Sequence, residues 1–308
     1  MIEVLGLTKR YGDMVAVNNL TFEVRPGVVT GFLGPNGAGK STTMRMILGL
    51  DHPTAGQALV DGRRYRTLDQ PLRSVGALLE SEALHPARSA RDNLRVAARS
   101  NGIPMSRVDG VIEEVGLAGV AKRRVKSYSL GMRQRLGIAT ALLGDPAVVL
   151  FDEPVNGLDV DGVRWVRHLV RDLAAAGRTV LVSSHLMSEM QQTADHLIVI
   201  GRGELIADAP IQDVLARAGA RTVRVGTADP DLLQRSLARF RAKVERLEDG
   251  VVLVTGVSTA DIGAAAREAN LTLHELTEVP ESLEQAFLHL TSASVEYPAS
   301  AAEPEGTR

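Results

Sequence analysis

The sequence contains no cysteine among its 308 residues, which excludes disulfide bonds and thiolate metal sites. It also has no uninterrupted run of about eighteen apolar residues, the length that a membrane-spanning helix requires. The first residues, MIEVLGLTKRYG, lack the charged-then-apolar layout of a signal peptide. These absences predict a cytoplasmic protein, and any work at a membrane would need another subunit to supply the membrane.

A strong excess of charge is missing as well. The formal net charge is −2, so nothing marks the whole chain as a binder of nucleic acid or of an acidic membrane, and no nucleic-acid partner is expected. Hydrophobic residues make up 44% and charged residues 23%, which is ordinary for a soluble globular protein. The length suffices for one large domain with a small one, or for two medium domains.

The segment GPNGAGKST lies between an apolar stretch of strand length, VVTGFL, and the helix-like MRMILGL. This order creates an anion site, because a helix N-terminus presents unpaired N–H groups and glycines let the backbone approach phosphates closely. Lys40 can reach terminal phosphates, and the Ser41 hydroxyl can hold magnesium. An ordinary glycine-rich turn is the alternative. The context favours a nucleotide-binding P-loop made of Gly34, Pro35, Asn36, Gly37, Ala38, Gly39, Lys40, Ser41 and Thr42.

Apolar strands and amphipathic helices alternate from the start of the chain to about residue 216. Continuous apolar strands such as VVLF and TVLV predict a sheet covered on both faces, hence an α/β core. The predicted strands are 28–32, 74–80, 147–152, 179–184 and 196–201, and the predicted helices are 89–100, 106–115, 132–143, 160–176 and 186–193.

The character of the chain changes near residue 217. Alternating TVRVG and VVLVTG, a helix-like ADIGAAAREA and further apolar segments predict a small α+β domain over 217–291. The last residues, 292–308, are rich in Ala, Ser, Pro and Glu and predict a disordered tail. No second P-loop occurs, so one nucleotide-binding unit is expected over residues 1–216.

The apolar strand AVVLFD ends in two consecutive carboxylates, Asp152 and Glu153. An Asp at the end of a strand beside a P-loop is placed to hold magnesium, directly or through water. Glu153 could orient or deprotonate the attacking water as a general base. Alternatively, the two carboxylates merely cap the turn after the strand.

A second helix start suited to anions lies in YSLGMRQRLGIATALL, residues 128–143. Ser129 is a good N-cap residue, Gly131 follows it, and two arginines lie on the first turns of the helix. One chain rarely needs two such termini for one triphosphate. Two copies arranged head to tail could sandwich the triphosphate, each contributing one terminus to each site.

In this order and at these spacings, the motifs resemble those of the ABC ATPases over residues 1 to about 216. The resemblance implies a P-loop NTPase core of ABC type with a helical subdomain at about 81–143, and ATP and Mg²⁺ as ligands. It also implies that Tyr11 stacks on adenine and that His185 senses the γ-phosphate, although Tyr11 alone could simply pack and His185 alone could be structural. Residues reaching across the dimer would be Ser129, Leu130, Gly131, Met132 and Asp159.

Two departures from the family pattern narrow the resemblance. The usual signature LSGGQ is YSLGM here, with Leu130 in place of a glycine and Met132 in place of the glutamine. The usual glutamine after a strand is Glu80, which could still ligate magnesium or a water with an added negative charge. Both substitutions resemble ATPase subunits of bacitracin-, lantibiotic- and daunorubicin-type drug exporters. The 217–291 appendage resembles extensions found on that branch, and dimer support or regulation are its open roles.

The resemblance therefore implies the ATP-hydrolysing subunit of an exporter at the cytoplasmic face of the membrane. Its partners would be a separate transmembrane permease and a second copy of this chain or a paralogous ATPase. A soluble ABC ATPase of translation or DNA repair is an alternative, although translation types usually carry two ATPase units and repair types insert a long coiled coil. A nucleotide sensor without hydrolysis is a third reading, which the presence of Glu153 opposes.

Overall fold

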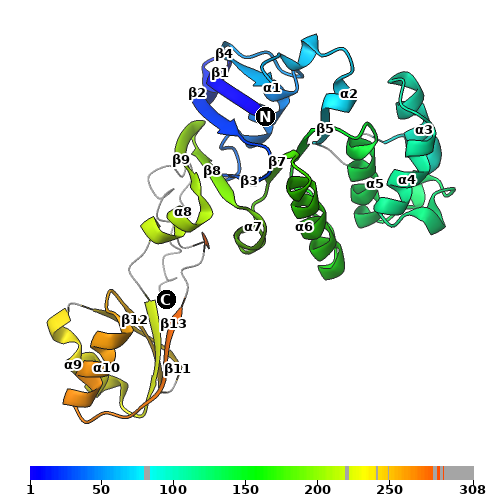
Figure 1. The fold of residues 1–308 in the computed structure, drawn as a ribbon. Coiled ribbons are helices and arrows are strands. Elements are labelled where there is room, and N and C mark those ends of the chain that lie inside the picture. The colour runs from blue at the N-terminus through cyan, green and yellow to red at the C-terminus, as the bar shows by residue number, and fades with distance from the viewer. Residues whose placement is uncertain are drawn as a thin grey trace, which may run out of the picture. The chain divides into compact units, whose positions relative to one another are not determined.

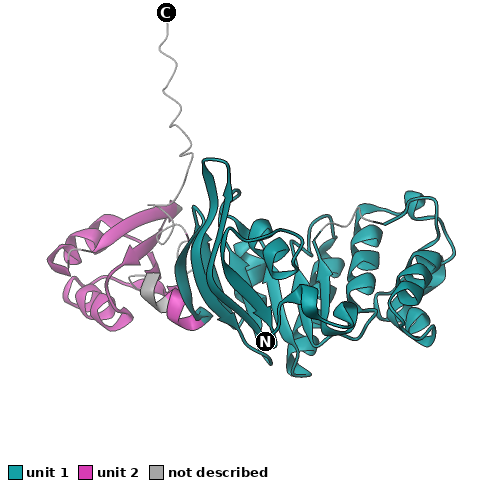
Figure 2. Ribbon diagram, turned by 90° about the horizontal axis from the view of Figure 1, so that it is seen from above, with its two compact units in different colours: residues 1–211, 291–308 teal, residues 212–290 magenta. Residues whose placement is uncertain are grey.

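The computed structural model describes residues 1–79, 84–218, 222–240, 242–248, 250–279, 283–284 and 287. These residues belong to two compact units, Met1–Ile211 and Gln212–Leu290 (Figure 2). The sequence placed this division near residue 217, whereas nearly all of α8 (Ile211–Ala218) falls in the second unit. The predicted tail, 292–308, and most of the apolar segment 281–290 lie outside the described residues.

A six-stranded sheet forms the centre of the first unit. Its strands are parallel except for the last pair, which is antiparallel. Every residue of β3, β6 and β7 is buried, so both faces of the sheet are covered and the predicted α/β core is confirmed. In spatial order the strands are β5 (Val75–Leu78), β6 (Val148–Phe151), β7 (Thr179–Ser183), β3 (Val29–Leu33), β8 (His196–Gly201) and β9 (Glu204–Pro210).

The first unit also has a separate antiparallel sheet, with two strands before the P-loop in sequence and one after it (Figure 1). It has the order β2 (Met14–Val24), β1 (Ile2–Tyr11), β4 (Ala55–Val60), and it was not among the strands predicted from the sequence. Its apolar side chains join one core cluster with Phe32 and Leu150 of the central sheet and Met44 of α1 (Lys40–Ile47). The strand before the P-loop and the helix after it therefore pack into the same core.

The helices of the first unit follow the predicted positions within a few residues. Helices α3, α4 and α5 pack against one another and gather at one end of the unit (Figure 1). No helix in the described part of the chain has the length and apolarity needed to cross a bilayer. The elements are α2 (Pro71–Ser74), α3 (Ala90–Ser100), α4 (Ser106–Glu114), α5 (Leu130–Leu142), α6 (Val160–Ala175), α7 (Met187–Thr193) and the short 3₁₀ turns η1 (Tyr65–Thr67), η2 (Ala118–Val120) and η3 (Val125–Ser127).

The second unit is a four-stranded antiparallel sheet with helices in βαββαβ order, the ferredoxin-like arrangement. Its core contains Val223, Val252, Leu233 and Ile262. The sheet has the order β11 (Lys243–Glu248), β12 (Val251–Thr255), β10 (Thr222–Thr227), β13 (Leu273–Val279), and the helical elements are α9 (Pro230–Ser236), η4 (Ala238–Phe240) and α10 (Thr259–Glu268).

Candidate functional site

The P-loop connects β3 to α1, and its backbone is shaped by a close approach that only glycine allows. Gly39, the N-cap of α1, has a φ of +103°. A Cβ atom at this position would lie 2.6 Å from the carbonyl oxygen of Ala16 on β2. The loop therefore curls tightly against the antiparallel sheet and leaves the N–H groups at the start of α1 open to an anion.

Lys40 is the first residue of α1, and its side chain is folded back onto the loop that precedes it. Lys40 is almost fully buried, with 8% of its surface exposed. Nζ donates hydrogen bonds to the carbonyl oxygens of Gly34 at 2.6 Å and Pro35 at 3.3 Å. Burial lowers the pKa of Lys40, while the nearby carboxylates of Glu153 and Asp152 act in the opposite direction. Within the described ranges no carboxylate forms an ion pair with this ammonium group, whose hydrogen bonds go to two backbone carbonyl oxygens.

Asp152 follows β6 and lies beside the P-loop, as the sequence indicated. One carboxylate oxygen, Oδ2, accepts a hydrogen bond from Ser41 Oγ at 2.7 Å. The other, Oδ1, accepts one from Ser183 Oγ at 2.5 Å. Hydroxyl and carboxylate oxygens are the hard ligands that Mg²⁺ takes, with the remaining positions filled by water and phosphate. The residues present therefore fit a magnesium ion, although no group of three or more acidic or histidine ligands occurs among the described residues.

Glu153 sits in a backbone conformation that is unusual for a glutamate, with a φ of +50°. Both of its peptide groups are held in place. Its N–H donates to Ser183 Oγ at 2.9 Å, and its carbonyl oxygen accepts from Gln134 Nε2 at 3.2 Å. Its Oε2 lies 2.7 Å from Nδ1 of His185, so the structure brings together the two residues predicted as catalytic.

The P-loop and the two carboxylates line one cavity of about 540 Å³. Tyr11, at the end of β1, also lines it and is 46% exposed. The Tyr11 hydroxyl donates to Asp51 Oδ2 at 3.3 Å, which fixes the ring at the border of the cavity. The ring is therefore not a core residue, and Lys9 Nζ lies over it, 4.8 Å from its centroid. The cavity lining further includes Met14, Val15, Ala16 and Arg202, none of which the sequence pointed to.

The signature segment lies at the start of α5. Ser129 is the N-cap and accepts a hydrogen bond from the N–H of Met132 at 3.2 Å. The exposed side chain of Leu130 covers Gly157, where a Cβ atom would lie 2.1 Å from Leu130 Cδ2. Leu130, which stands where the family signature has a glycine, therefore packs against Gly157, the glycine of the VNGLD segment.

Asp159 caps α6 by accepting a hydrogen bond from the N–H of Gly162 at 2.8 Å. None of Ser129, Gly131 and Asp159 lines the cavity that contains the P-loop of the same chain. A role for these residues in nucleotide binding would therefore require a second copy. Glu80 lies outside the described residues, and its predicted role stays a prediction.

Sequence reasoning missed two side chains that hold the site together. Ser183 is fully buried at the end of β7 and bridges Asp152 and the peptide of Glu153. The sequence does show a serine at the end of an apolar strand. The carboxyl ends of parallel strands lie at one edge of the sheet, so this position could have indicated a site residue. Gln134 reaches Glu153 from α5, a tertiary contact that left no local pattern in the sequence.

The chain is similar to known proteins over both of its parts. Residues 17–156 match the family described as "ABC transporter", and residues 220–284 match a domain of unknown function. The bacitracin transport ATP-binding protein BcrA of Bacillus licheniformis is 41% identical over 70% of this chain and 72% of its own length. An uncharacterized ABC transporter ATP-binding protein of Bacillus subtilis, YhcH, is 35% identical over 96% of this chain and 97% of its own. A dimeric bacterial ABC transporter cassette superposes with a TM-score of 0.63 at 25% identity, covering 68% of this chain and 99% of that one.

Proposed function

The chain is a member of the ABC transporter family of ATP-binding proteins, and we propose that it powers the export of antibiotic-like compounds through a separate membrane subunit. It is an ATPase with the α/β core of the P-loop type. The alternative of an ATPase in translation or DNA repair is not favoured, because relatives covering most of the chain are transporter subunits.

One observation carries the proposal: a single cavity contains the P-loop on one side and Asp152 with Glu153 on the other. A phosphate chain bound at the start of α1 would have its terminal group beside these carboxylates. Two oxygen groups suited to magnesium, on Ser41 and Asp152, and a candidate base therefore lie within one site, as phosphoryl transfer to water requires.

ATP binding would begin with Lys40. Its Nζ would leave the carbonyl oxygens of Gly34 and Pro35 and contact the terminal phosphates, which restores an anionic partner to a buried cation. The exposed ring of Tyr11 would stack on the adenine. Ser41 and Asp152 would hold a magnesium ion, which supplies neutralisation of the phosphate charge when bound.

Glu153 would accept the proton of the attacking water. Its carboxylate lies 2.7 Å from Nδ1 of His185, and its backbone is held by Ser183 and Gln134. Because a general base must be held within hydrogen-bond reach of the water, these contacts would supply its orientation. The Nε2 atom of His185 is then the ring nitrogen that could face the γ-phosphate.

A second ATPase copy would complete the site with Ser129, Gly131 and Asp159. The capped start of α5 presents N–H groups to an anion, and these residues do not line the cavity of their own chain. The solved cassette with this fold is described as dimeric, which supports a pair of copies. The pair would act at the cytoplasmic face of the membrane, bound to its permease.

The transported compound is proposed from the relatives. BcrA of Bacillus licheniformis is named for bacitracin transport, and the YSLGM form of the signature segment in this chain resembles that of bacitracin-type exporters. We infer an amphipathic peptide antibiotic as the class of cargo for this chain.

The membrane subunit is first identified by co-purification with this chain. The two are then expressed together in an antibiotic-sensitive bacterium. We expect higher inhibitory concentrations of bacitracin or a lantibiotic with the wild type, and no increase with Glu153→Gln. A purified complex should also show ATP turnover that these compounds change. Unchanged sensitivity together with intact ATP turnover would contradict antibiotic export, while absent turnover would contradict the ATPase assignment itself.

A further inference from the structure

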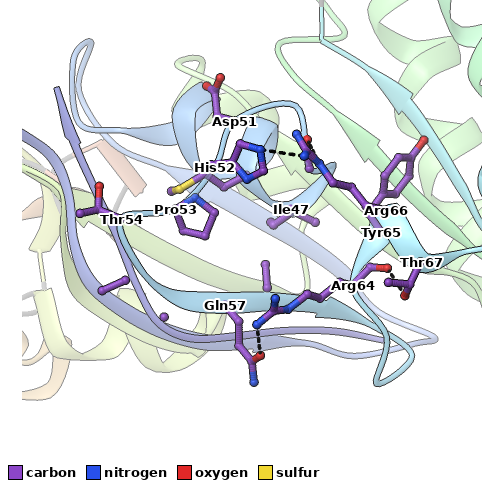
Figure 3. A pocket seen from close by; sticks show the side chains of 15 residues that line it. Ile47, Asp51, His52, Pro53, Thr54, Gln57, Arg64, Tyr65, Arg66 and Thr67 are labelled. Atoms are coloured by element: carbon purple, nitrogen blue, oxygen red, sulfur yellow. Dashed lines mark hydrogen bonds between the residues drawn. The ribbon is translucent and has the colours of Figure 1, made fainter.

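A second cavity of about 420 Å³ lies in the first unit, at the end of α1 (Figure 3). Figure 3 shows Ile47, His52 and Pro53 on one side of it and Gln57 and Arg64 on the other. It shares no lining residue with the nucleotide cavity. Its volume is within the range of about 300–1,000 Å³ that is typical of small-molecule sites.

The floor of this cavity is apolar. Met46, Ile47 and Ala58 line it and belong to the core cluster that joins the two sheets. Tyr65 packs against the same cluster, and burial raises the pKa of its hydroxyl, so the phenol stays neutral. A neutral aromatic ring and buried methyl groups favour the apolar body of a ligand over a fully hydrated ion.

The rim of the cavity is cationic. Arg66 donates from Nε to the carbonyl oxygen of Gly49 at 2.7 Å, and its Nη1 lies 2.7 Å from Nε2 of His52. Arg64 donates from Nη2 to Oε1 of Gln57 at 3.2 Å. These partners are a backbone carbonyl, an imidazole and a side-chain amide, and no carboxylate forms an ion pair with either arginine among the described residues. Each guanidinium has five N–H donors, so several remain for a ligand.

Asp51 is the acidic residue in the cavity lining, but it is already engaged. Arg45 Nε donates to its Oδ2 at 2.9 Å, and this hydrogen bond is the main reason that the pKa of Asp51 lies below its usual value. The hydroxyl of Tyr11 contacts the same oxygen. Asp51 therefore does not neutralise Arg64 or Arg66.

We propose that this cavity is a second ligand site, for a small amphipathic anion separate from ATP. A carboxylate, sulfonate or phosphate group of the ligand contacts Arg66, on the His52 side of the cavity, or Arg64, on the Gln57 side, where charge-assisted and bidentate hydrogen bonds are available (Figure 3). Its apolar body lies over Ile47, Ala58 and the ring of Tyr65. The inference holds whichever compound the transporter exports, since it uses none of the nucleotide-site residues.

The probe for this site is 8-anilinonaphthalene-1-sulfonate, an amphipathic anion whose fluorescence rises in apolar surroundings. It is titrated into the full chain with saturating ADP and Mg²⁺, so that the nucleotide cavity is filled. We expect saturable binding of one probe per chain. The double variant Arg64→Gln/Arg66→Gln should bind it at least about tenfold more weakly, as the loss of charge-assisted hydrogen bonds predicts. The neutral analogue N-phenyl-1-naphthylamine should bind the wild type more weakly by a similar factor.

Two further variants complete the experiment. Arg25→Gln/Arg95→Gln removes the same charge from exposed positions outside the cavity and should bind the probe as the wild type does. Ala55→Trp fills the cavity without changing charge and should abolish probe binding while ADP affinity, the measure of folding, is kept. No saturable binding to the wild type, or equal binding to the wild type and both cavity variants, would overturn the proposal. So would equal affinity for the neutral analogue.

Discussion

Nδ1 of His185 lies 2.7 Å from Oε2 of Glu153, and the N–H of His185 approaches the same oxygen at 3.3 Å. The ring and the backbone of one residue thus orient one carboxylate oxygen. The candidate base and the candidate γ-phosphate sensor are therefore in direct contact. A change at either residue is expected to affect the position of the other.

Replacing the candidate base separates ATP binding from hydrolysis. Glu153→Gln keeps the shape of the side chain but cannot accept a proton, so turnover should fall about 10²–10⁴-fold. ATP should then accumulate between two copies, held by Lys40 of one and Ser129 of the other. Loss of a negative charge near the γ-phosphate should favour this closed dimer further. Light scattering with and without ATP and Mg²⁺, beside a turnover assay, measures both effects.

The control for this experiment is Glu113→Gln, which removes an exposed carboxylate from α4. It should leave both turnover and oligomeric state unchanged. Unimpaired hydrolysis in Glu153→Gln would remove Glu153 from the role of base. Lost turnover without any ATP-dependent dimer, even with the membrane subunit present, would count against the head-to-tail arrangement.

Lys40→Ala should largely abolish ATP binding, because the loop loses the ammonium that contacts the terminal phosphates. Burial lowers the pKa of Lys40 in the nucleotide-free chain, whereas bound phosphates would raise it. The affinity of the wild type for ATP should therefore decrease as pH rises through that lowered value, since binding then requires uptake of a proton. Calorimetric titration at several pH values tests this, and near-normal affinity in the variant would contradict the P-loop assignment.

Tyr11→Ala should weaken the binding of both ATP and GTP while leaving turnover at saturation unchanged. Stacking of a base on an aromatic ring contributes about 1–3 kcal/mol. Tyr11→Phe is the matched control, because it keeps the ring but loses the hydrogen bond to Asp51. Unchanged affinity in the alanine variant, together with a lower melting temperature, would show that Tyr11 only supports the fold.

Ser183→Ala should reduce both stability and turnover. The partly buried N–H of Glu153 would lose its acceptor, a loss of about 1–3 kcal/mol in the free energy of unfolding. Asp152 would lose the donor to Oδ1, so the Mg²⁺ dependence of turnover should shift to higher concentration. Ser184→Ala is the control, since the Oγ of this neighbouring buried serine accepts from the N–H of Leu186 and has no hydrogen bond to Asp152 or Glu153 among the described residues. Equal effects of the two substitutions would contradict the role of Ser183.

The central strands and most helices could be predicted from the sequence because their patterns are local. Strands such as β6 and β7 are apolar at every position, and α5 begins at a serine that caps it, as expected. The antiparallel sheet was missed because its pattern is interrupted. Register shifts break the β1–β2 pairing, and Gly6 and Asn19 take positive φ values within the strands. Alternation of apolar and polar residues is lost at such irregularities.

The candidate site divides in the same way. Its P-loop, Asp152 and Glu153 follow one another along short motifs, so their positions could be read from spacing. The contacts of Ser183 and Gln134 with Glu153 join segments 30 and 19 residues apart. Such contacts depend on strand order and helix packing, which no single stretch of sequence encodes.

Because of the left-handed backbone at Glu153, a substitution that raises the thermostability of the protein is expected to lower its activity. Holding a non-glycine residue in this region typically costs about 1–3 kcal/mol, and asparagine adopts it more readily than glutamate. We therefore expect Glu153→Asn to raise the melting temperature in calorimetry while eliminating turnover, whereas Glu153→Gln leaves the backbone strain in place. A lower melting temperature for the asparagine variant would contradict this. Selection for a thermostable form of this protein would then favour the loss of its candidate base, and only selection for transport would retain it.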